Sequence, residues 1–347
     1  MHNSQSGQPQ ATILENGVSV PGGPFGALTK GDCVGCHSSS TSATRGGTAH
    51  QIPMVYNTVD PNYGSYGTDG ETLAGGNFYW VKHGTGADNL GHNVDGICTV
   101  DATLRTPPGF DGGRADPQGN KPGGGTWPSG QQVTCAGIYG CHGRHTTDDN
   151  YDGLRGAHHG EDSVIDGSTV AKSYRFLLGV QGIEDSKWEY QPTSSTHNQY
   201  KGMDRTSDSA FDTATISYLC GQCHGGFHSG SGMVGSASAW LRHPTDFDLG
   251  RATGTEYQYY NNGSGGMATY SVIAPVASAD LTGNPLSTVN VAGGGNDTAI
   301  VTCISCHRAH GTRWDDLLRW QYMGEDGMKA NSGAGNVGCF ICHTTKD

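Results

Sequence analysis

Apolar residues are scarce in this sequence. Hydrophobic residues make up 34% of its 347 positions, whereas soluble domains usually contain about 45–50%. Glycine is abundant instead, with 57 residues, more than twice its usual share of about 7%. A chain of this length would ordinarily form about one to three domains around apolar cores. The composition therefore indicates that something other than apolar side chains fills much of the interior.

Long hydrophobic runs and an excess of positive charge are also missing. No run of about 18 apolar residues occurs, so we expect no transmembrane segment. Residues 1–32 are polar and rich in glycine and proline, without the apolar stretch of a signal peptide. Lysine and arginine total 20 against 32 acidic residues, which gives a net charge of −12. This charge disfavours nucleic-acid binding and suits basic partners, metal cations or cationic surfaces.

Cysteine and histidine are frequent, with 11 and 16 residues, and their spacing is regular. In four places, two cysteines separated by two residues are followed directly by a histidine, the pattern typical of c-type haem attachment. Two sulfurs at this spacing lie on one side of a helical turn and can bond the haem vinyl groups, while the histidine binds the iron. The four motifs are Cys33, Cys36 and His37; Cys220, Cys223 and His224; Cys303, Cys306 and His307; and Cys339, Cys342 and His343.

Other uses of paired cysteines explain this pattern less well. Four pairs could build two structural zinc sites of the Cys₄ type, but thiolate ligands need no trailing histidine. A disulfide framework would leave the four histidines equally unexplained. A thioredoxin-like redox motif would need one pair in a β-α-β setting, which the sequence does not offer.

A fifth, looser motif lies between the first and second regular ones. Cys135 is followed by Cys141 and His142, with five residues between the cysteines instead of two. Glycines in this interval would allow the loop to bulge outward and bring both sulfurs to one porphyrin edge. The alternative is a disulfide between Cys98 and Cys135, with Cys141 holding a haem by one thioether or serving another purpose. We expect a fifth haem at this motif.

Each c-type haem also needs a ligand on the other side of its iron. Eleven histidines remain beyond the five proximal ones, against only seven methionines, which favours bis-histidine, six-coordinate, low-potential haems. His310 lies three residues after a proximal histidine and shares its face, so it can serve only a neighbouring haem. His145 and His228 have the same relation to their motifs, with a solvated histidine or a propionate partner as the alternative. The preferred distal ligands are His50, His92, His158 or His159, His197, His243 and His310.

The expected fold is mostly irregular coil with short helices and a few short strands or hairpins, wrapped around a chain of covalently bound c-type haems. Helical turns are expected at the haem motifs and over Asp315–Tyr322. Residues 77–81 are expected as a short strand, 106–130 as a loop, and 163–183, including 173–178, as a strand or hairpin. We treat 1–347 as a single multihaem unit, with 1–32 as an N-terminal segment available for contact between subunits.

Several stretches resemble the large exported multihaem cytochromes of metal-reducing bacteria. The attachment motifs carry most of this resemblance, and Cys98 and the wide Cys135–Cys141 spacing depart from it. Some members of this group polymerise into extracellular cytochrome filaments, often called microbial nanowires. The stretches that carry the resemblance are Cys303–Gly311 with Leu317–Trp320, Gly75–Trp80, Gly91–Val94, Trp240–Thr245 and Gly338–Asp347.

The resemblance implies extracellular electron transfer without catalysis, by a secreted protein located outside the cell or at its surface. Its partners would be other copies of itself, redox partners and extracellular electron acceptors. We expect filament growth to use a histidine donated across subunits, with His50 as the first candidate and His2 as the second. The alternatives are a monomeric periplasmic electron shuttle and a multihaem reductase of nitrite, hydroxylamine, tetrathionate or a similar oxyanion. A reductase needs one five-coordinate iron, whereas all five motifs end in histidine.

Overall fold

A computed structural model describes most of the chain. Backbone and side chains are described for 32–40, 52–62, 71–84, 89–110, 121–158, 164–207, 210–228, 244–252, 259–261, 263, 266–292, 297–322 and 338–344. For 4–5, 8–9, 12–15, 18–21, 44–45, 159 and 262, only the backbone is described.

Most of the described chain is irregular, as the composition predicts, and its helices are short. The longest described helix, α4 (Ile216–Cys223), has eight residues. The other α-helices are α1 (Cys33–Cys36), α2 (Tyr79–His83), α3 (Asn150–Gly153), α5 (Gly225–His228) and α6 (Cys303–Cys306). The 3-10 helices are η3 (Ala157–His159), η4 (Val170–Lys172), η5 (Tyr174–Phe176), η7 (Leu249–Ala252), η8 (Tyr260–Asn262), η9 (Asp315–Leu317) and η10 (Gly338–Ile341).

The described strands are equally short, and they pair two by two instead of forming a larger sheet. The antiparallel pairs are β1 (Ser4–Gln5) with β2 (Gln8–Pro9), β3 (Thr12–Glu15) with β4 (Val18–Pro21), β6 (Thr44–Arg45) with β7 (Ile52–Pro53), β11 (Gly182–Ile183) with β12 (Gln199–Tyr200), β13 (Phe247–Asp248) with β16 (Ile300–Val301), and β14 (Met267–Thr269) with β15 (Thr288–Asn290). The parallel pairs are β5 (Ser38–Ser39) with β8 (Tyr56–Asn57), and β9 (Thr134–Ala136) with β10 (Gly140–His142).

The prediction of a strand at residues 77–81 is wrong, because helix α2 begins there. The Asn77 side chain accepts hydrogen bonds from the backbone N–H groups of Asn57 and Tyr79, both at 3.0 Å. These bonds turn the chain into the helix, which then buries Trp80 and Val81. A local side-chain hydrogen bond has outweighed the strand propensity of an aromatic run.

Two further local predictions are mostly wrong. Within 163–183, expected as a strand or hairpin, Gly182–Ile183 form the short strand β11, but residues 170–172 and 174–176 form η4 and η5, and Arg175 and Phe176 have φ of 49° and 61°. Of the helix expected over Asp315–Tyr322, only η9 forms, because Asp316 and Leu317 also have positive φ. Left-handed backbone at non-glycine residues stops regular structure. The loop predicted over 106–130 is confirmed for its described residues.

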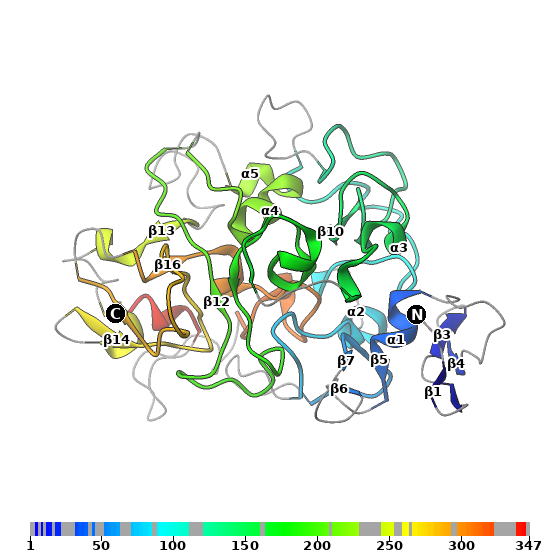
Figure 1. The fold of residues 1–347 in the computed structure, drawn as a ribbon, viewed down its shortest axis with the longest axis horizontal. Coiled ribbons are helices and arrows are strands. Elements are labelled where there is room, and N and C mark those ends of the chain that lie inside the picture. The colour runs from blue at the N-terminus through cyan, green and yellow to red at the C-terminus, as the bar shows by residue number, and fades with distance from the viewer. Residues whose placement is uncertain are drawn as a thin grey trace.

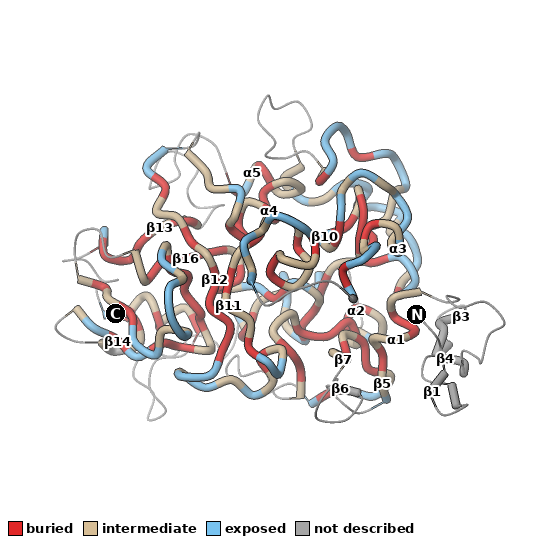
Figure 2. The backbone as a smooth tube through the Cα atoms, viewed as in Figure 1, coloured by how far each residue is buried: buried red, intermediate tan, exposed pale blue. Residues whose placement is uncertain are grey.

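Three separate hydrophobic clusters replace one large core, and buried stretches run through the whole length of the chain in Figure 2. Each cluster is bordered by cysteines of the attachment motifs: Cys135 in the N-terminal cluster, Cys220 in the central one, and Cys306, Cys339 and Cys342 in the C-terminal one. The buried members of the N-terminal cluster are Val34, Tyr56, Phe78, Val81, Val94 and Ile97. Those of the central cluster are Tyr174, Leu177, Val180, Tyr200, Ile216, Leu219, Ala277, Ile300 and Ile304.

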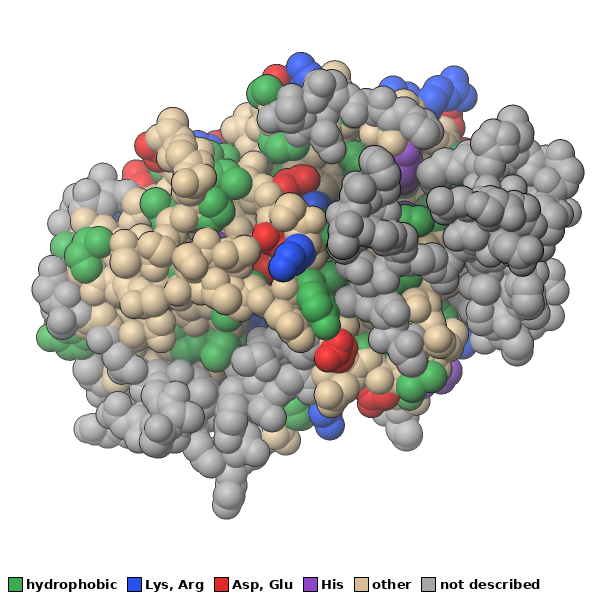
Figure 3. Space-filling view, turned by 60° about the horizontal axis from the view of Figure 1, so that its bottom comes forward, with side chains coloured by type: hydrophobic (Ala, Val, Ile, Leu, Met, Phe, Trp, Pro, Cys, Tyr) green, Lys and Arg blue, Asp and Glu red, His purple; other side chains and the backbone are tan. Residues whose placement is uncertain are grey.

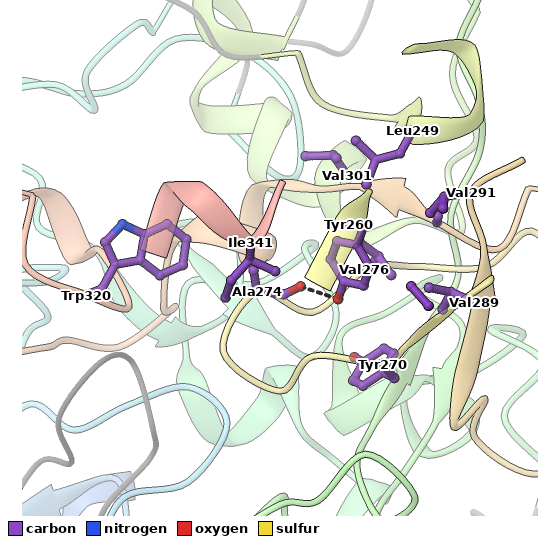
Figure 4. Packing of buried hydrophobic residues seen from close by; sticks show 12 residues of the cluster. Leu249, Tyr260, Tyr270, Ala274, Val276, Val289, Val291, Val301, Trp320 and Ile341 are labelled. Atoms are coloured by element: carbon purple, nitrogen blue, oxygen red, sulfur yellow. Dashed lines mark hydrogen bonds between the residues drawn. The ribbon is translucent and has the colours of Figure 1, made fainter. Parts of the chain in front are cut away.

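The C-terminal cluster is the largest of the three, and Figure 4 shows its packing. Tyr260 is fully buried, and its hydroxyl donates a hydrogen bond of 2.7 Å to the Ala274 carbonyl oxygen. A buried phenol needs such a partner. The buried residues of the C-terminal cluster are Leu249, Tyr260, Ala268, Tyr270, Ala274, Val276, Val289, Val291, Ala299, Val301, Trp320 and Ile341.

The molecule is elongated, with the first and last attachment motifs toward opposite ends. In Figure 1, α1 lies near one end of the longest axis, and the C-terminus lies near the other. In the described part of the face in Figure 3, backbone and uncharged side chains outside the hydrophobic group cover most of the surface, and hydrophobic side chains are scattered among them. Among the described helices, none has the length and apolar character needed to cross a lipid bilayer.

Candidate haem-binding sites

We number the attachment motifs in chain order: motif 1 (Cys33, Cys36, His37), motif 2 (Cys135, Cys141, His142), motif 3 (Cys220, Cys223, His224), motif 4 (Cys303, Cys306, His307) and motif 5 (Cys339, Cys342, His343).

Motifs 1, 3, 4 and 5 each lie on a helical turn, as the Cys-x-x-Cys spacing predicts. The Asp32 side chain begins α1 by accepting a hydrogen bond of 2.8 Å from the Gly35 N–H, and Thr215 begins α4 by accepting one of 3.1 Å from the Tyr218 N–H. Thr302 and Ser305 form a capping box around α6. These caps satisfy N–H groups that a helix end leaves free. In motifs 1 and 4 the capping residue directly precedes the first cysteine, whereas Thr215 caps α4 five residues before Cys220. Motif 5 lies on η10.

Motif 2 uses a different local structure, because five residues separate its cysteines. Cys135 lies on β9 and Cys141 on β10, and these two strands pair in parallel through Thr134 with Gly140 and Ala136 with His142. A side chain at Gly140 would meet the Ala136 N–H at 2.6 Å, so the close approach requires glycine. The wide motif is therefore a tight loop that brings its two cysteines onto neighbouring strands.

Four of the five proximal histidines have the same ring orientation. In each, Nδ1 lies within hydrogen-bond distance of a backbone carbonyl oxygen, which selects the tautomer protonated at Nδ1 and leaves the lone pair of Nε2 to act as the metal ligand. Metal-binding histidines are typically held in this way. The contacts are His37 to Pro53 at 2.8 Å, His142 to Arg175 at 2.9 Å, His224 to Pro108 at 2.7 Å and His307 to Asp316 at 2.7 Å.

Three proximal histidines face a second histidine at the separation that a shared metal requires. A metal–nitrogen bond measures about 2.0–2.1 Å, and an imidazole nitrogen lies about 1.1 Å from its ring centre, so two axial imidazoles have centres about 6.3 Å apart. The ring centres are 6.4 Å apart for His37 and His158, 6.4 Å for His142 and His310, and 6.0 Å for His224 and His92. The residues therefore fit bis-histidine coordination in motifs 1, 2 and 3.

Burial keeps these rings in the neutral form that a metal requires. Desolvation, followed by repulsion from His142, lowers the pKa of His310 to about 3. Desolvation, followed by the nearby His92, lowers the pKa of His224 to about 4. His92 is oriented like the proximal ligands, since its Nδ1 lies 2.7 Å from the Ala309 carbonyl oxygen.

The other predicted distal ligands are placed less completely. In His197, which is fully buried, Nδ1 lies 2.7 Å from the Asn198 carbonyl oxygen and Nε2 lies 3.1 Å from that of Leu286. Ligation through Nε2 would replace the second contact. His50, His243 and the side chain of His159 lie outside the described residues. His158 is described, and its ring faces that of His37.

Two histidines close to the motifs have other surroundings. The His228 Nε2 atom lies 2.8 Å from Asp246 Oδ2, and Arg205 donates to the His228 carbonyl oxygen at 2.6 Å. All three residues are buried. His145 holds Nδ1 at 2.9 Å from the Gly137 carbonyl oxygen, as the ligands do, while its buried Nε2 has no hydrogen-bond partner within the described part of the chain. His145, His228 and His310 all lie three or four residues after a proximal histidine in the sequence. Only their contacts in the structure differ.

Cysteine contacts between motifs place the motifs in sequence order in space. The side chains of Cys33 and Cys135 lie beside each other and so bring motifs 1 and 2 together. Those of Cys220 and Cys303 join motifs 3 and 4 in the same way. Burial raises the pKa of Cys223 to about 12, and nearby Cys141 of motif 2 adds to the shift.

The fourth link joins motifs 4 and 5. Burial raises the pKa of Cys306 to about 12, and nearby Cys339 of motif 5 adds to the shift. The five motifs therefore form one continuous row.

Cys98 lies apart from this row and forms no disulfide. Its Sγ atom lies 3.5 Å from the Val81 carbonyl oxygen, and burial raises the pKa of its thiol. Cys135 contacts Cys33 instead. The alternative of a disulfide between Cys98 and Cys135 is therefore not seen, and Cys98 packs as a small apolar residue beside the N-terminal cluster.

Comparison with known proteins agrees with the haem chemistry. No protein-family model matches the chain. It is 23% identical over 373 aligned positions to the C-type cytochrome OmcS of Geobacter sulfurreducens, covering 92% of this chain and 77% of OmcS.

Two solved structures are similar, the outer membrane cytochrome S filament of Geobacter sulfurreducens and the OmcS nanowires of the same organism. Both are 19% identical to this chain and cover all of it; the TM-scores are 0.49 and 0.45, with 97% and 88% of the solved chains covered. The attachment motifs and the sequence similarity along most of the chain both agree with a multihaem c-type cytochrome that binds haem c covalently.

Proposed function

We propose that this protein transfers electrons along a row of five bis-histidine haems and acts outside the cell as a subunit of a cytochrome filament. The three histidine pairs at 6.0–6.4 Å are the observation that carries the proposal. They supply both axial ligands for three irons from separate parts of the chain, and the cysteine contacts arrange all five motifs in one row.

The protein residues do three things in this scheme. Bound haem supplies a one-electron couple at each site. Cysteine pairs fix the position of each site, so that transfer needs no diffusion of a carrier. Histidine pairs fill both axial positions and leave no room for a substrate. Carbonyl oxygens such as those of Pro53 and Asp316 accept from Nδ1–H and strengthen the ligand field of the ring, which tunes the potential.

The number of haems tests the assignment of motif 2. We expect the intact mass of the purified protein to correspond to five covalent haems, because Cys135 and Cys141 lie on paired strands and His142 faces His310. Substituting Cys141→Ser should lower the haem count by one, while Cys98→Ser leaves it at five. A wild-type mass with four haems would contradict the assignment.

The coordination state separates electron transfer from catalysis. A reductase of nitrite or a similar oxyanion needs an iron with one open position, whereas bis-histidine ligation closes both. We expect the reduced protein to bind no carbon monoxide and the oxidised protein to show only low-spin iron in electron paramagnetic resonance. A substantial high-spin signal would favour the reductase.

Filament assembly is supported by two independent features. The terminal motifs lie toward opposite ends of the long axis, so head-to-tail contacts would continue the row from one subunit to the next (Figure 1). The relative OmcS is known as a filament in the solved structures that bear its name. Electron microscopy of the purified protein should show fibres. A monodisperse monomer would instead favour a soluble periplasmic shuttle.

His50 remains the first candidate for a ligand donated across the subunit contact, with His2 the second. Both lie outside the described residues. Replacing His50→Ala should keep five haems while shortening or abolishing fibres. Normal fibres with unchanged spectra would reject His50 as the donor without affecting the electron-transfer function.

A further inference from the structure

One short segment of the chain serves three haem sites. Residues 303–307 form motif 4, and His310, three residues further on, faces His142 of motif 2. The carbonyl oxygen of Ala309, between them, holds Nδ1 of His92, the histidine that faces His224 of motif 3. Movement of 309–310 would therefore disturb the distal ligands of two haems that are attached elsewhere.

Backbone hydrogen bonds hold this segment between two other stretches of chain. On one side, the His310 N–H donates to the Gly75 carbonyl oxygen at 2.7 Å, and the Asn77 N–H donates to that of Gly311 at 2.8 Å. On the other, the His92 N–H donates to the His310 carbonyl oxygen at 3.1 Å. The segment thus lies between two other stretches that hydrogen-bond to it, and its position depends on them.

Arg308 links this segment to one of those two stretches. Its side chain is almost fully buried, at 1% exposure, in a chain of net charge −12. Its guanidinium Nη1 donates to the carbonyl oxygen of Ala74 at 2.7 Å, directly before Gly75. Its own N–H donates to the Leu317 carbonyl oxygen at 2.8 Å. A charge-assisted hydrogen bond in a buried place is stronger than an ordinary one.

We propose that Arg308 is a positioning residue that holds His310 and His92 on the irons of the motif 2 and motif 3 haems. The proposal rests on the proposed function, because it assumes that both histidines are distal ligands. In this proposal, Arg308 acts through the backbone and is not itself a ligand. It acts by fixing 73–76 against 308–311. This fixes the position of the His310 ring relative to the motif 2 site and the position of the Ala309 carbonyl oxygen that orients His92.

The test removes the guanidinium and counts the irons that open. We expect Arg308→Gln to keep five covalent haems, because no cysteine is changed, and to bind up to two carbon monoxide molecules per reduced chain, against none in the wild type. In the oxidised Arg308→Gln variant, the number of high-spin irons per chain should equal the number of carbon monoxide molecules that the reduced variant binds. Arg308→Lys, which can still donate to Ala74, should bind less carbon monoxide than the Gln variant. Arg105→Gln, at an exposed site, is the matched control and should bind none.

A second measurement shows whether the effect passes through the two histidines. In a His92→Ala, His310→Ala background, two irons are already open, and Arg308→Gln should add no further carbon monoxide site. Additional sites there, or a Gln variant that stays fully six-coordinate, would overturn the proposal. If the Gln variant does not fold, Arg308→Met removes the donor without burying an unpaired polar group. Loss of folded protein in both variants would assign Arg308 to general folding and also overturn it. Carbon monoxide binding by the wild type would instead contradict the proposed function.

Discussion

A histidine that binds iron needs one ring nitrogen unprotonated, and at the residue scale a carbonyl contact at Nδ1 meets this requirement; His145 has the same contact, so the contact alone does not identify a ligand. His37, His92 and His224 meet it through carbonyl contacts at Nδ1. His228 does not, because its Nε2 lies against Asp246. The proximal ligands could be predicted from sequence because the neighbouring cysteines mark them. The distal partners could not be paired, since each comes from a distant segment.

The pairing predicts which iron opens when a distal ligand is removed. Replacing His158→Ala should leave five haems attached and open one iron per chain, at motif 1, because the ring facing His37 is lost. Carbon monoxide titration of the reduced protein measures the number. His83→Ala is the control, since His83 contacts Tyr56 and Tyr79 and faces no proximal histidine. Equal carbon monoxide binding by both variants would reject the pairing.

The cluster of Arg205, His228 and Asp246 predicts a loss of stability without a change in ligation. Asp246→Ala leaves buried donors without their acceptor, which costs about 1–3 kcal/mol, and places alanine at a backbone φ of 55°. Asp246→Asn keeps an acceptor and tolerates this φ, so its loss should be smaller. Denaturant unfolding measures both, and their absorption spectra should match the wild type. A shift in the spectra would show that His228 acts on a haem.

At the scale of elements, the helical turns of the motifs were predictable because spacing and caps are local. Helix α2 and the turns at η5 and η9 were not. Their conformations depend on Asn77 bonding to Asn57, and on Arg175 and Asp316 offering carbonyl oxygens to proximal histidines at left-handed backbone. Those partners lie 9 to 33 residues away in the sequence, so no pattern within the element itself signals them.

Close backbone packing around His310 predicts a strong effect from one added methyl group. A side chain at Gly91 would meet a methyl group of Val81 at 2.2 Å and the His310 carbonyl oxygen at 2.5 Å. Gly91→Ala should therefore displace His310 and His92 together, open up to two irons, and cost about 1–3 kcal/mol from overpacking. Carbon monoxide binding and thermal unfolding check this. Gly124→Ala, where no atom lies within 4 Å, should leave every iron six-coordinate.

At the scale of the whole molecule, three modest clusters bordered by haem-bonding cysteines take the place of one core. The scarcity of apolar residues indicated this, and the row of motifs could not have been placed from sequence because it depends on contacts such as Cys33 with Cys135. The fold class was predictable from the sequence, whereas the course of the chain between the motifs was not.

The same feature predicts that the chain depends on haem attachment to fold. A variant with all ten motif cysteines replaced by alanine should show little fixed structure by circular dichroism and no cooperative thermal transition, because the clusters lose the group that joins them. The wild type, with its haems, should unfold cooperatively. A cooperative transition in the haem-free variant would show that the polypeptide alone forms a sufficient core.

The sharing of 303–311 among three sites also limits how such a protein can change over evolution. In solenoid repeats, a unit contacts only its neighbours, so units can be duplicated or deleted singly. Here, a chain ending before motif 4 would keep the cysteines of motifs 2 and 3 and yet lack His310 and the Ala309 carbonyl oxygen that orients His92. Single haem sites therefore cannot be gained or lost without disturbing the others. Changing the number of joined subunits is therefore a simpler way to lengthen or shorten the row of haems than adding or removing haem sites within one subunit.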